Sequence, residues 1–158
     1  MNVELAVVLQ QLILGRSTAA LGTLHQGLPF VSMVPYAAAR DGSFILHVSR
    51  LAAHTRDMLD NPDVSLLITE AEASGKMPQA LARVTVQGRA VMLDRDSERY
   101  KEMRALYLAR FPDAAQLFEF SDFSLFIIEP ASARLIAGFG QAVTTTREDL
   151  TAALSAAT

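Results

Sequence analysis

Residues 44–68 read FILHVSRLAAHTRDMLDNPDVSLLI, and this stretch decides the fold. Its two ends, residues 44–48 and 64–68, are rich in aliphatic and β-branched side chains, which predicts two buried strands. The polar segment between them ends at Asn61-Pro62, a strong turn signal. The stretch therefore predicts a strand, a short polar helix and a second strand.

The polar segment also has the composition of an anion-binding site. A helix that begins near Ala53 would direct its free backbone N–H groups and its positive dipole end toward the same side as Ser49, His54 and Arg56. A phosphate group needs this combination of donors. The alternative is a solvated helical connection with ordinary surface charges, and the composition alone leaves both interpretations open.

Strand patterns continue on both sides of this stretch. Turn signals at Gln26-Gly27 and at residues 40–42 separate the first strands, which are predicted to form consecutive antiparallel hairpins. A long alternating strand is expected later, followed by a last strand pair joined by a turn at Glu129-Pro130. Besides 44–48 and 64–68, the predicted strands are 18–24, 29–37, 81–93, 123–128 and 133–136.

Helical patterns lie around these strands. Residues 3–14 have apolar side chains at helical spacing, and residues 94–111 form a second helical pattern with Asp96 or Ser97 as its N-cap. Pro112 starts a short helix, and the tail after Gly140 is predicted as a loop with a weak helix from Arg147.

The fold class that follows is mainly β, a small closed antiparallel barrel of six or seven strands with peripheral helices. The connections between the first strands are too short for the crossover helices of a parallel sheet. We expect one domain over residues 1–158, with a leading helix at 1–15 and a tail at 141–158.

The composition of the chain limits the classes of partner that it can be expected to bind. Aliphatic and aromatic residues make up 51% of the chain and charged residues only 20%, so we expect a second copy to cover part of the apolar surface in a homodimer. A net charge of −3 without a basic block argues against nucleic acid. The first apolar run is too short to span a bilayer and lacks the flanks of a signal peptide, so the predicted location is cytoplasmic, with no membrane partner.

The residues available for chemistry are few. The chain has no cysteine, which excludes disulfides, thiolate ligands and cysteine nucleophiles, and its three histidines are too scattered to predict a metal site. His25 is expected to be solvated in a hairpin turn, His47 to lie in the core or line a cavity, and His54 is the best placed for binding. No acid/base pair or nucleophile motif stands out, so no catalytic residue is assigned.

The ordered segments RSTAALGTL, G-x-P, SMVPY, DG, HVSRLAAHTRDMLDNPDVSLLI and ARVTVQG resemble the split-barrel flavin-binding family related to pyridoxamine 5′-phosphate oxidase, and within it the haem-utilisation branch. The resemblance covers residues 12–142, including DFSLF and GFGQA. It implies a six-stranded Greek-key split barrel of the FMN-binding type, and a homodimer that holds FMN in clefts between its subunits.

The resemblance also implies a set of cofactor-binding residues. One strand would run beside the flavin ring, while two other positions would lie near the ribityl chain and phosphate. His54 falls where the oxidases carry a phosphate-binding lysine, Arg56 would replace an arginine whose own position is Ala53, and Arg83 matches a polar cofactor contact. The set is Ser32, Met33, Val34, Pro35, Val48, Ser49, His54, Arg56 and Arg83.

The sequence departs from the family pattern at positions that bear on vitamin B6 oxidation and on haem degradation. The C-terminal arginine and histidine that grip the vitamin B6 substrate in true oxidases are missing, and Asp57 stands where this branch usually has an amide. The chain also stops near residue 158, whereas longer haem-utilisation relatives continue into a second domain that can supply haem contacts.

The resulting expectation is an FMN-dependent oxidoreductase that acts on a small molecule of unknown identity. Two alternatives remain: a protein that binds or degrades haem, and a binding module without catalytic activity.

Overall fold

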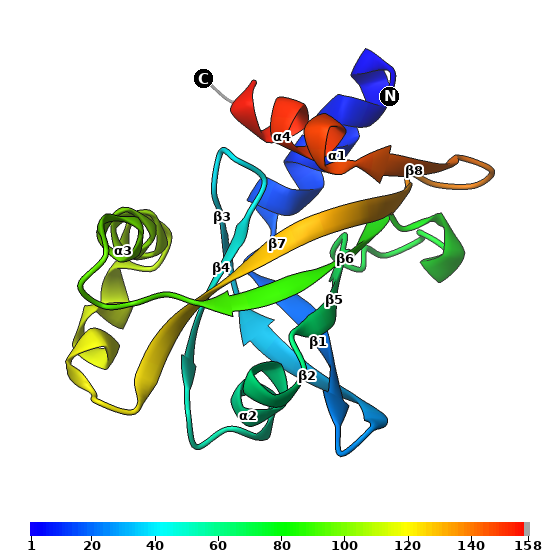
Figure 1. Ribbon diagram of the computed structural model, residues 1–158. Helices are drawn as coiled ribbons and strands as arrows, with labels where there is room; N and C mark the ends of the chain where they lie inside the picture. The colour runs from blue at the N-terminus through cyan, green and yellow to red at the C-terminus, as the bar shows by residue number, and fades with distance from the viewer. Residues whose placement is uncertain (157–158) are drawn as a thin grey trace.

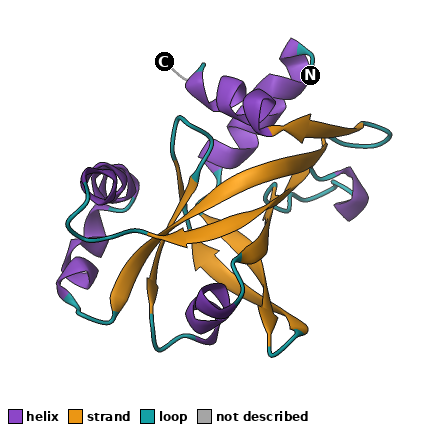
Figure 2. Ribbon diagram, viewed as in Figure 1, coloured by secondary structure: helices purple, strands orange, loops and turns teal. Residues whose placement is uncertain are grey.

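An eight-stranded sheet runs through residues 1–156, the part of the chain that this computed structural model describes, and every pair of neighbouring strands is antiparallel (Figures 1 and 2). The strand order is β2-β1-β5-β6-β7-β4-β3, and β8 pairs with β7. The strands are β1 (Thr18–His25), β2 (Leu28–Pro35), β3 (Ala37–Ala38), β4 (Phe44–Ser49), β5 (Asp63–Thr69), β6 (Arg83–Met92), β7 (Phe123–Ile136) and β8 (Ala142–Thr146).

The helices lie around the sheet, as predicted. Ser97 caps α3 with its side chain, and Asn2 caps α1 in the same way. The mainly β architecture with peripheral helices is therefore confirmed. The helices are α1 (Val3–Gly15), α2 (Ala53–Asp60), α3 (Glu98–Arg110) and α4 (Arg147–Ser155), with 3₁₀ turns η1 (Pro78–Ala80) and η2 (Pro112–Glu119).

The first predicted hairpin is confirmed. β1 and β2 pair along their whole length, from Thr18 opposite Pro35 to His25 opposite Leu28. Gln26 and Gly27 connect them with φ angles of 52° and 80°, the left-handed backbone that tight hairpin turns need.

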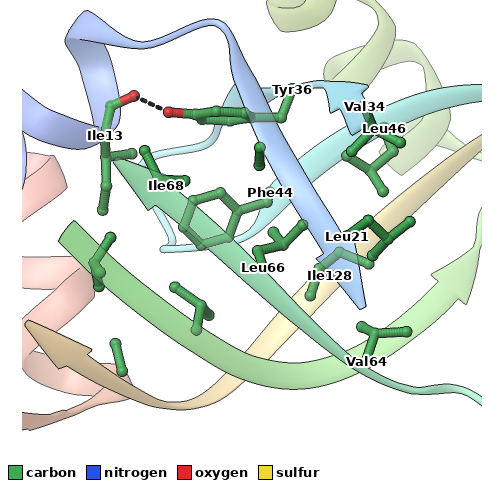
Figure 3. Packing of buried hydrophobic residues seen from close by; sticks show 14 of the residues in the cluster. Ile13, Leu21, Val34, Tyr36, Phe44, Leu46, Val64, Leu66, Ile68 and Ile128 are labelled. Atoms are coloured by element: carbon green, nitrogen blue, oxygen red, sulfur yellow. Dashed lines mark hydrogen bonds between the residues drawn. The ribbon is translucent and has the colours of Figure 1, made fainter. Parts of the chain in front are cut away.

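The second predicted hairpin forms only next to its turn at residues 40–42, where residues 37–38 of β3 pair with residues 44–45 of β4. The rest of the strand expected over residues 29–37 does not pair with β4, and the prediction of a closed barrel is wrong. Among the described residues β2 pairs only with β1, whereas β4 pairs with β7 and with the short β3. The chain turns away at Tyr36, which is buried and donates its hydroxyl hydrogen to the Ile13 carbonyl at 2.6 Å (Figure 3). This contact with α1 ends the strand, so β2 remains a free edge of a split barrel.

The predicted last strand pair is one continuous strand, β7. Its Glu129-Pro130 step pairs with Arg89 and Gly88 of β6, where the register shifts between Gln87 and Gly88. A bulge of this kind accommodates a proline that cannot donate a ladder hydrogen bond. The local turn signal was thus overridden by pairing with a neighbouring strand.

The predicted helix from Arg147 is confirmed as α4, whereas the segment before it is more ordered than the predicted loop. Residues 142–146 form β8, and Thr146 and Asp149 then make a capping box that starts α4. Leu150 and Leu154 of α4 are buried, and α4 packs beside α1 at the top of Figure 1. With β3 and β8 counted, the sheet has eight strands instead of six; residues 157 and 158 of the predicted tail lie outside the described part.

Two hydrophobic clusters hold the sheet. The larger fills the inside of the curved sheet with side chains such as Leu21, Phe44 and Leu66 (Figure 3). The smaller lies on the other side of β4 and β7, where Met103 and Tyr107 of α3 pack against them. Because both faces of β4 are covered, five of its six residues are buried, which explains its continuous apolar run.

Candidate functional site

Helix α2 lies beside the β1–β2 hairpin, at the lower end of the molecule in Figure 1. It begins at Ala53, as the sequence predicted, and its N-cap Ala52 makes no side-chain capping hydrogen bond. The first N–H groups of the helix therefore have no protein side chain as cap, the arrangement that favours an anion.

The polar side chains before α2 do not point to this helix start. The Ser49 hydroxyl donates to Asp122 Oδ2 at 2.7 Å and accepts from the Leu51 N–H at 3.1 Å. The Arg50 guanidinium donates to the Ser121 carbonyl at 2.6 Å. A carboxylate thus lies within hydrogen-bond distance of Ser49, where the resemblance would place a phosphate, and two negative groups repel each other at such a distance.

Apart from Ser49 and Arg83, the predicted cofactor residues lie in three places. His54 is half-buried and Arg56 is exposed, both on α2, and no hydrogen bond or ion pair engages the Arg56 side chain within residues 1–156. Val48 is buried in the core. Ser32, Met33, Val34 and Pro35 lie on the edge strand β2, where Val34 points into the core and Met33 is exposed.

Arg83 lies far from α2. Arg83 is the first residue of β6 and pairs with Thr69, the last residue of β5. Helix α2 precedes the opposite end of β5, which begins at Asp63. Seven residues of strand span about 20 Å, so a single chain does not bring Arg83 and Arg56 into one site. The Arg83 guanidinium instead donates to the carbonyls of Gln79 and Leu81. Whether a partner subunit unites these residues stays a prediction.

A hollow of about 520 Å³ opens between Arg50, residues 92–95 and the serines at 121 and 124. None of the nine predicted residues lines it. Its two arginines are held by backbone carbonyls, Arg50 by Ser121 and Arg95 by Phe123 at 2.6 Å. Since these donors are already engaged, the hollow offers little free charge to a ligand.

A polar cluster that the sequence did not predict joins α2 to the hairpin. Asp57 is only 4% exposed, and its two carboxylate oxygens accept from the Thr23 hydroxyl at 2.9 Å and pair with His25 Nδ1 at 2.7 Å. Burial alone would raise the pKa of Asp57, but the hydrogen bonds from His25 and Thr23 outweigh it and hold that pKa below its usual value.

His25 was predicted to be a solvated turn residue, but it is the partly exposed partner of the buried Asp57. An ionised carboxylate can only accept hydrogen bonds, so His25 Nδ1 carries the hydrogen and Nε2 remains the free ring nitrogen. The His25 side chain is 41% exposed. The sequence did carry one signal at this position, because Asp57 departs from the amide that the family resemblance implies there.

His47 belongs to the core and not to a ligand site. Its ring stacks on Phe118 at 3.7 Å between centroids, and its Nδ1 has no partner among the described residues. Burial, together with the charges of Arg95 and Arg104, lowers its pKa to about 4. His47 is thus a neutral aromatic member of the cluster under α3 and η2.

The outer face of the sheet beside β2 is apolar and exposed. Met33 pairs with Ala20, and Ala20 pairs with Leu67, so these three side chains form a row across β2, β1 and β5. Met33 and Val31 are each 69% exposed. We call Val31, Met33, Ala20 and Leu67 the outer apolar face, and an apolar surface of this kind is typical of a partner contact.

No helix within residues 1–156 is long and apolar enough to cross a membrane. No group of three or more histidine, cysteine, aspartate or glutamate side chains in the same range is placed to hold a metal ion.

The sequence of this chain is similar to those of several known proteins. The family described as pyridoxamine 5′-phosphate oxidase matches residues 7–137. The haem oxygenase HutZ of Vibrio cholerae is 36% identical over 137 residues, which cover 85% of this chain and 77% of that protein. The chloroplastic haem oxygenase HOZ of Arabidopsis thaliana is 40% identical over 118 residues, or 75% of this chain but only 35% of HOZ.

A solved structure agrees with these matches. The structure of a haem-binding protein from Mycobacterium smegmatis superposes with a TM-score of 0.86 at 28% sequence identity. The superposition covers 96% of this chain and 62% of the mycobacterial one. The chain therefore spans most of the Vibrio protein but less than two thirds of the mycobacterial and plant proteins.

Proposed function

Because the chain belongs to the pyridoxamine 5′-phosphate oxidase family and falls with its haem-utilisation branch, we propose that it is a haem-binding protein. The observation that carries the proposal is the 36% identity to a haem oxygenase over 85% of the chain. The names of the relatives describe either haem breakdown or haem binding, and binding is the step that both share.

The residues present fit a haem group. Haem iron takes an axial ligand from histidine, methionine, tyrosine or cysteine, and this chain has no cysteine. His47 is buried, which leaves His25 and His54 as accessible imidazoles, both close to Asp57. Apolar side chains surround the hairpin and Arg56 is a free cation on α2, as a flat apolar group with two carboxylates requires.

Bound haem would supply iron-centred redox chemistry. The chain itself would supply an imidazole nitrogen, an apolar surface and a cation for a propionate. Haem breakdown is an extension of this proposal, since no residue within 1–156 stands out as an acid or base beyond the histidines already named.

FMN is the second candidate, as a cofactor of an oxidoreductase. The uncapped start of α2 and the free Arg56 favour it, because both suit a phosphate. The hydrogen bond between Ser49 and Asp122 counts against it, since it occupies the predicted phosphate contact with a carboxylate. A binding module without catalytic activity is the third candidate.

A cofactor titration of the purified chain tests the proposal. Haem is expected to give a saturable Soret band at one equivalent per chain, while FMN is expected to keep its free fluorescence. Quenching of FMN fluorescence without a haem-induced Soret band would instead establish the flavin protein. A chain that takes up neither would be the binding module.

A further inference from the structure

We infer that His25 is the axial ligand that this chain presents to haem iron, with Asp57 as the residue that positions it. The inference rests on the proposed haem binding and assigns the coordinating atom, His25 Nε2.

The pair is built from two separate elements of the fold. His25 ends β1, and Asp57 lies in the middle of α2, 32 residues further along the chain. The 2.7 Å contact between Nδ1 and Oδ1 fixes the ring, and the Thr23 hydroxyl holds the second carboxylate oxygen at 2.9 Å. Thr23 is itself buried. The carboxylate is thus anchored from one side before it orients the imidazole on the other.

The hydrogen-bond pattern prepares the outer nitrogen for a metal. Nδ1 is occupied as a donor to Asp57, so the lone pair of a neutral His25 lies on Nε2. Histidines that ligate metals usually donate their other ring N–H to a carboxylate or carbonyl, which fixes the tautomer and makes the ligand more basic. A solvated surface histidine has no such buried partner.

The surroundings of His25 suit the ring of a haem. Leu28 lies directly opposite His25 on β2, and Phe30 lies opposite Thr23, so both share a face of the hairpin with His25. The Phe30 ring is 5.3 Å from the imidazole, and Leu28 is 70% exposed. An exposed imidazole edge is therefore bordered by apolar side chains, with Arg56 on the neighbouring helix available to a carboxylate.

Two other roles compete with this one. His54 lies three residues before Asp57 on the same helix and is also half-buried, so it is the alternative ligand. The His25–Asp57 contact could also serve only to join α2 to the hairpin. A test must therefore separate ligation from folding and His25 from His54.

The test is haem binding by the full chain, read by the Soret band and by the iron–histidine stretching band of the ferrous complex in resonance Raman spectra. His25→Gln keeps a side-chain N–H for Asp57 but offers no imidazole. We expect it to lose the iron–histidine band, to weaken haem binding by at least about tenfold, and to regain the band when free imidazole is added. Gln26→Asn, in the adjacent turn, is the matched control and should keep the wild-type spectrum.

Asp57→Asn tests the positioning role. Loss of the carboxylate should move the iron–histidine stretch to lower frequency while haem remains bound, a change that a purely structural contact would not produce. An iron–histidine band that persists in His25→Gln, or that disappears in His54→Gln, overturns the inference and leaves haem binding intact. A wild-type chain without a haem-induced Soret band overturns both.

Discussion

At the scale of single residues, burial has opposite outcomes for the charge of two side chains, the carboxylate of Asp57 and the imidazole of His47. Asp57 keeps its charge because Thr23 and His25 both hydrogen-bond to it. His47 loses its charge because aromatic rings surround it and its Nδ1 finds no partner in the described part of the chain. Of the two histidines in these arrangements, only His25, which is bound to Asp57, keeps a ring nitrogen accessible to a ligand.

His47 should make the protein sensitive to mild acid. Its pKa is about 4 in the folded chain and 6.5 in the unfolded chain, so both states are neutral above pH 6.5. As the pH falls from 6.5 toward 4, only the unfolded state takes up the proton. The free energy of unfolding should therefore fall by about 2 kcal/mol between pH 7.5 and pH 5 on account of this residue.

Urea unfolding at the two pH values measures this effect. His47→Phe preserves the stack on Phe118 and removes the titrating group, so it should lose less stability between the two pH values than the wild type. Burial also lowers the pKa of His54, so the comparison between the two proteins, and not the wild-type curve alone, isolates His47. Equal losses in both proteins would contradict the assignment.

At the scale of elements, the C-terminal part of the chain shows how strands and helices depend on one another. β8 has only five residues, and it is held by its pairing with the end of β7. α4 follows at once and buries Leu150, Ala153 and Leu154 against the larger cluster. The helix thus covers one end of the barrel core beside α1.

The capping box at the start of α4 should contribute measurably to stability. Thr146 accepts the Asp149 N–H with its hydroxyl, and Asp149 accepts the Thr146 N–H with its carboxylate. Thr146→Ala should lower the free energy of unfolding by about 1 kcal/mol, because it removes the N-cap acceptor. Chemical denaturation measures the loss, and Thr146→Ser, which keeps the hydroxyl, is the control. An unchanged midpoint in the alanine variant would show that α4 does not depend on its cap.

At the scale of the whole molecule, β2 leaves a free edge and the outer apolar face is uncovered. We therefore continue to propose a homodimer, in which a partner would cover Val31, Met33 and Leu67. Burying an apolar surface contributes roughly 25 cal/mol per Å² before the cost of association. A cofactor cleft between subunits would also explain how Arg83 and α2 could serve the same ligand.

Met33→Asp tests the dimer. A charge in the middle of the outer apolar face should convert a dimer at micromolar concentration into a monomer, since it would be buried without a partner. Light scattering coupled to size exclusion gives the mass. Val3→Asp, at an 80% exposed position of α1, is the control and should leave the dimer intact. A monomeric wild-type chain would end the dimer proposal.

The sequence alone determined the elements whose signals are local. Periodicity predicted α1, Ser97 marked the start of α3, Gln26-Gly27 gave the first hairpin, and Asn61-Pro62 ended α2. These features depend only on residues that are close in the sequence, so they can be predicted from the sequence without the fold. The ordered motifs from 12 to 142 likewise identified the family, which the match over 7–137 confirmed.

The tertiary structure decided everything that depends on register between distant segments. Glu129-Pro130 continues β7 because the register with β6 shifts there and leaves Ala131 of β7 as the extra residue of a bulge. β2 separates from β4 where Tyr36 contacts Ile13. His25 and Asp57 meet because the hairpin and α2 pack together across 32 residues of chain. No local pattern contains such a contact, since its free energy comes from burial and pairing that exist only once the sheet has formed.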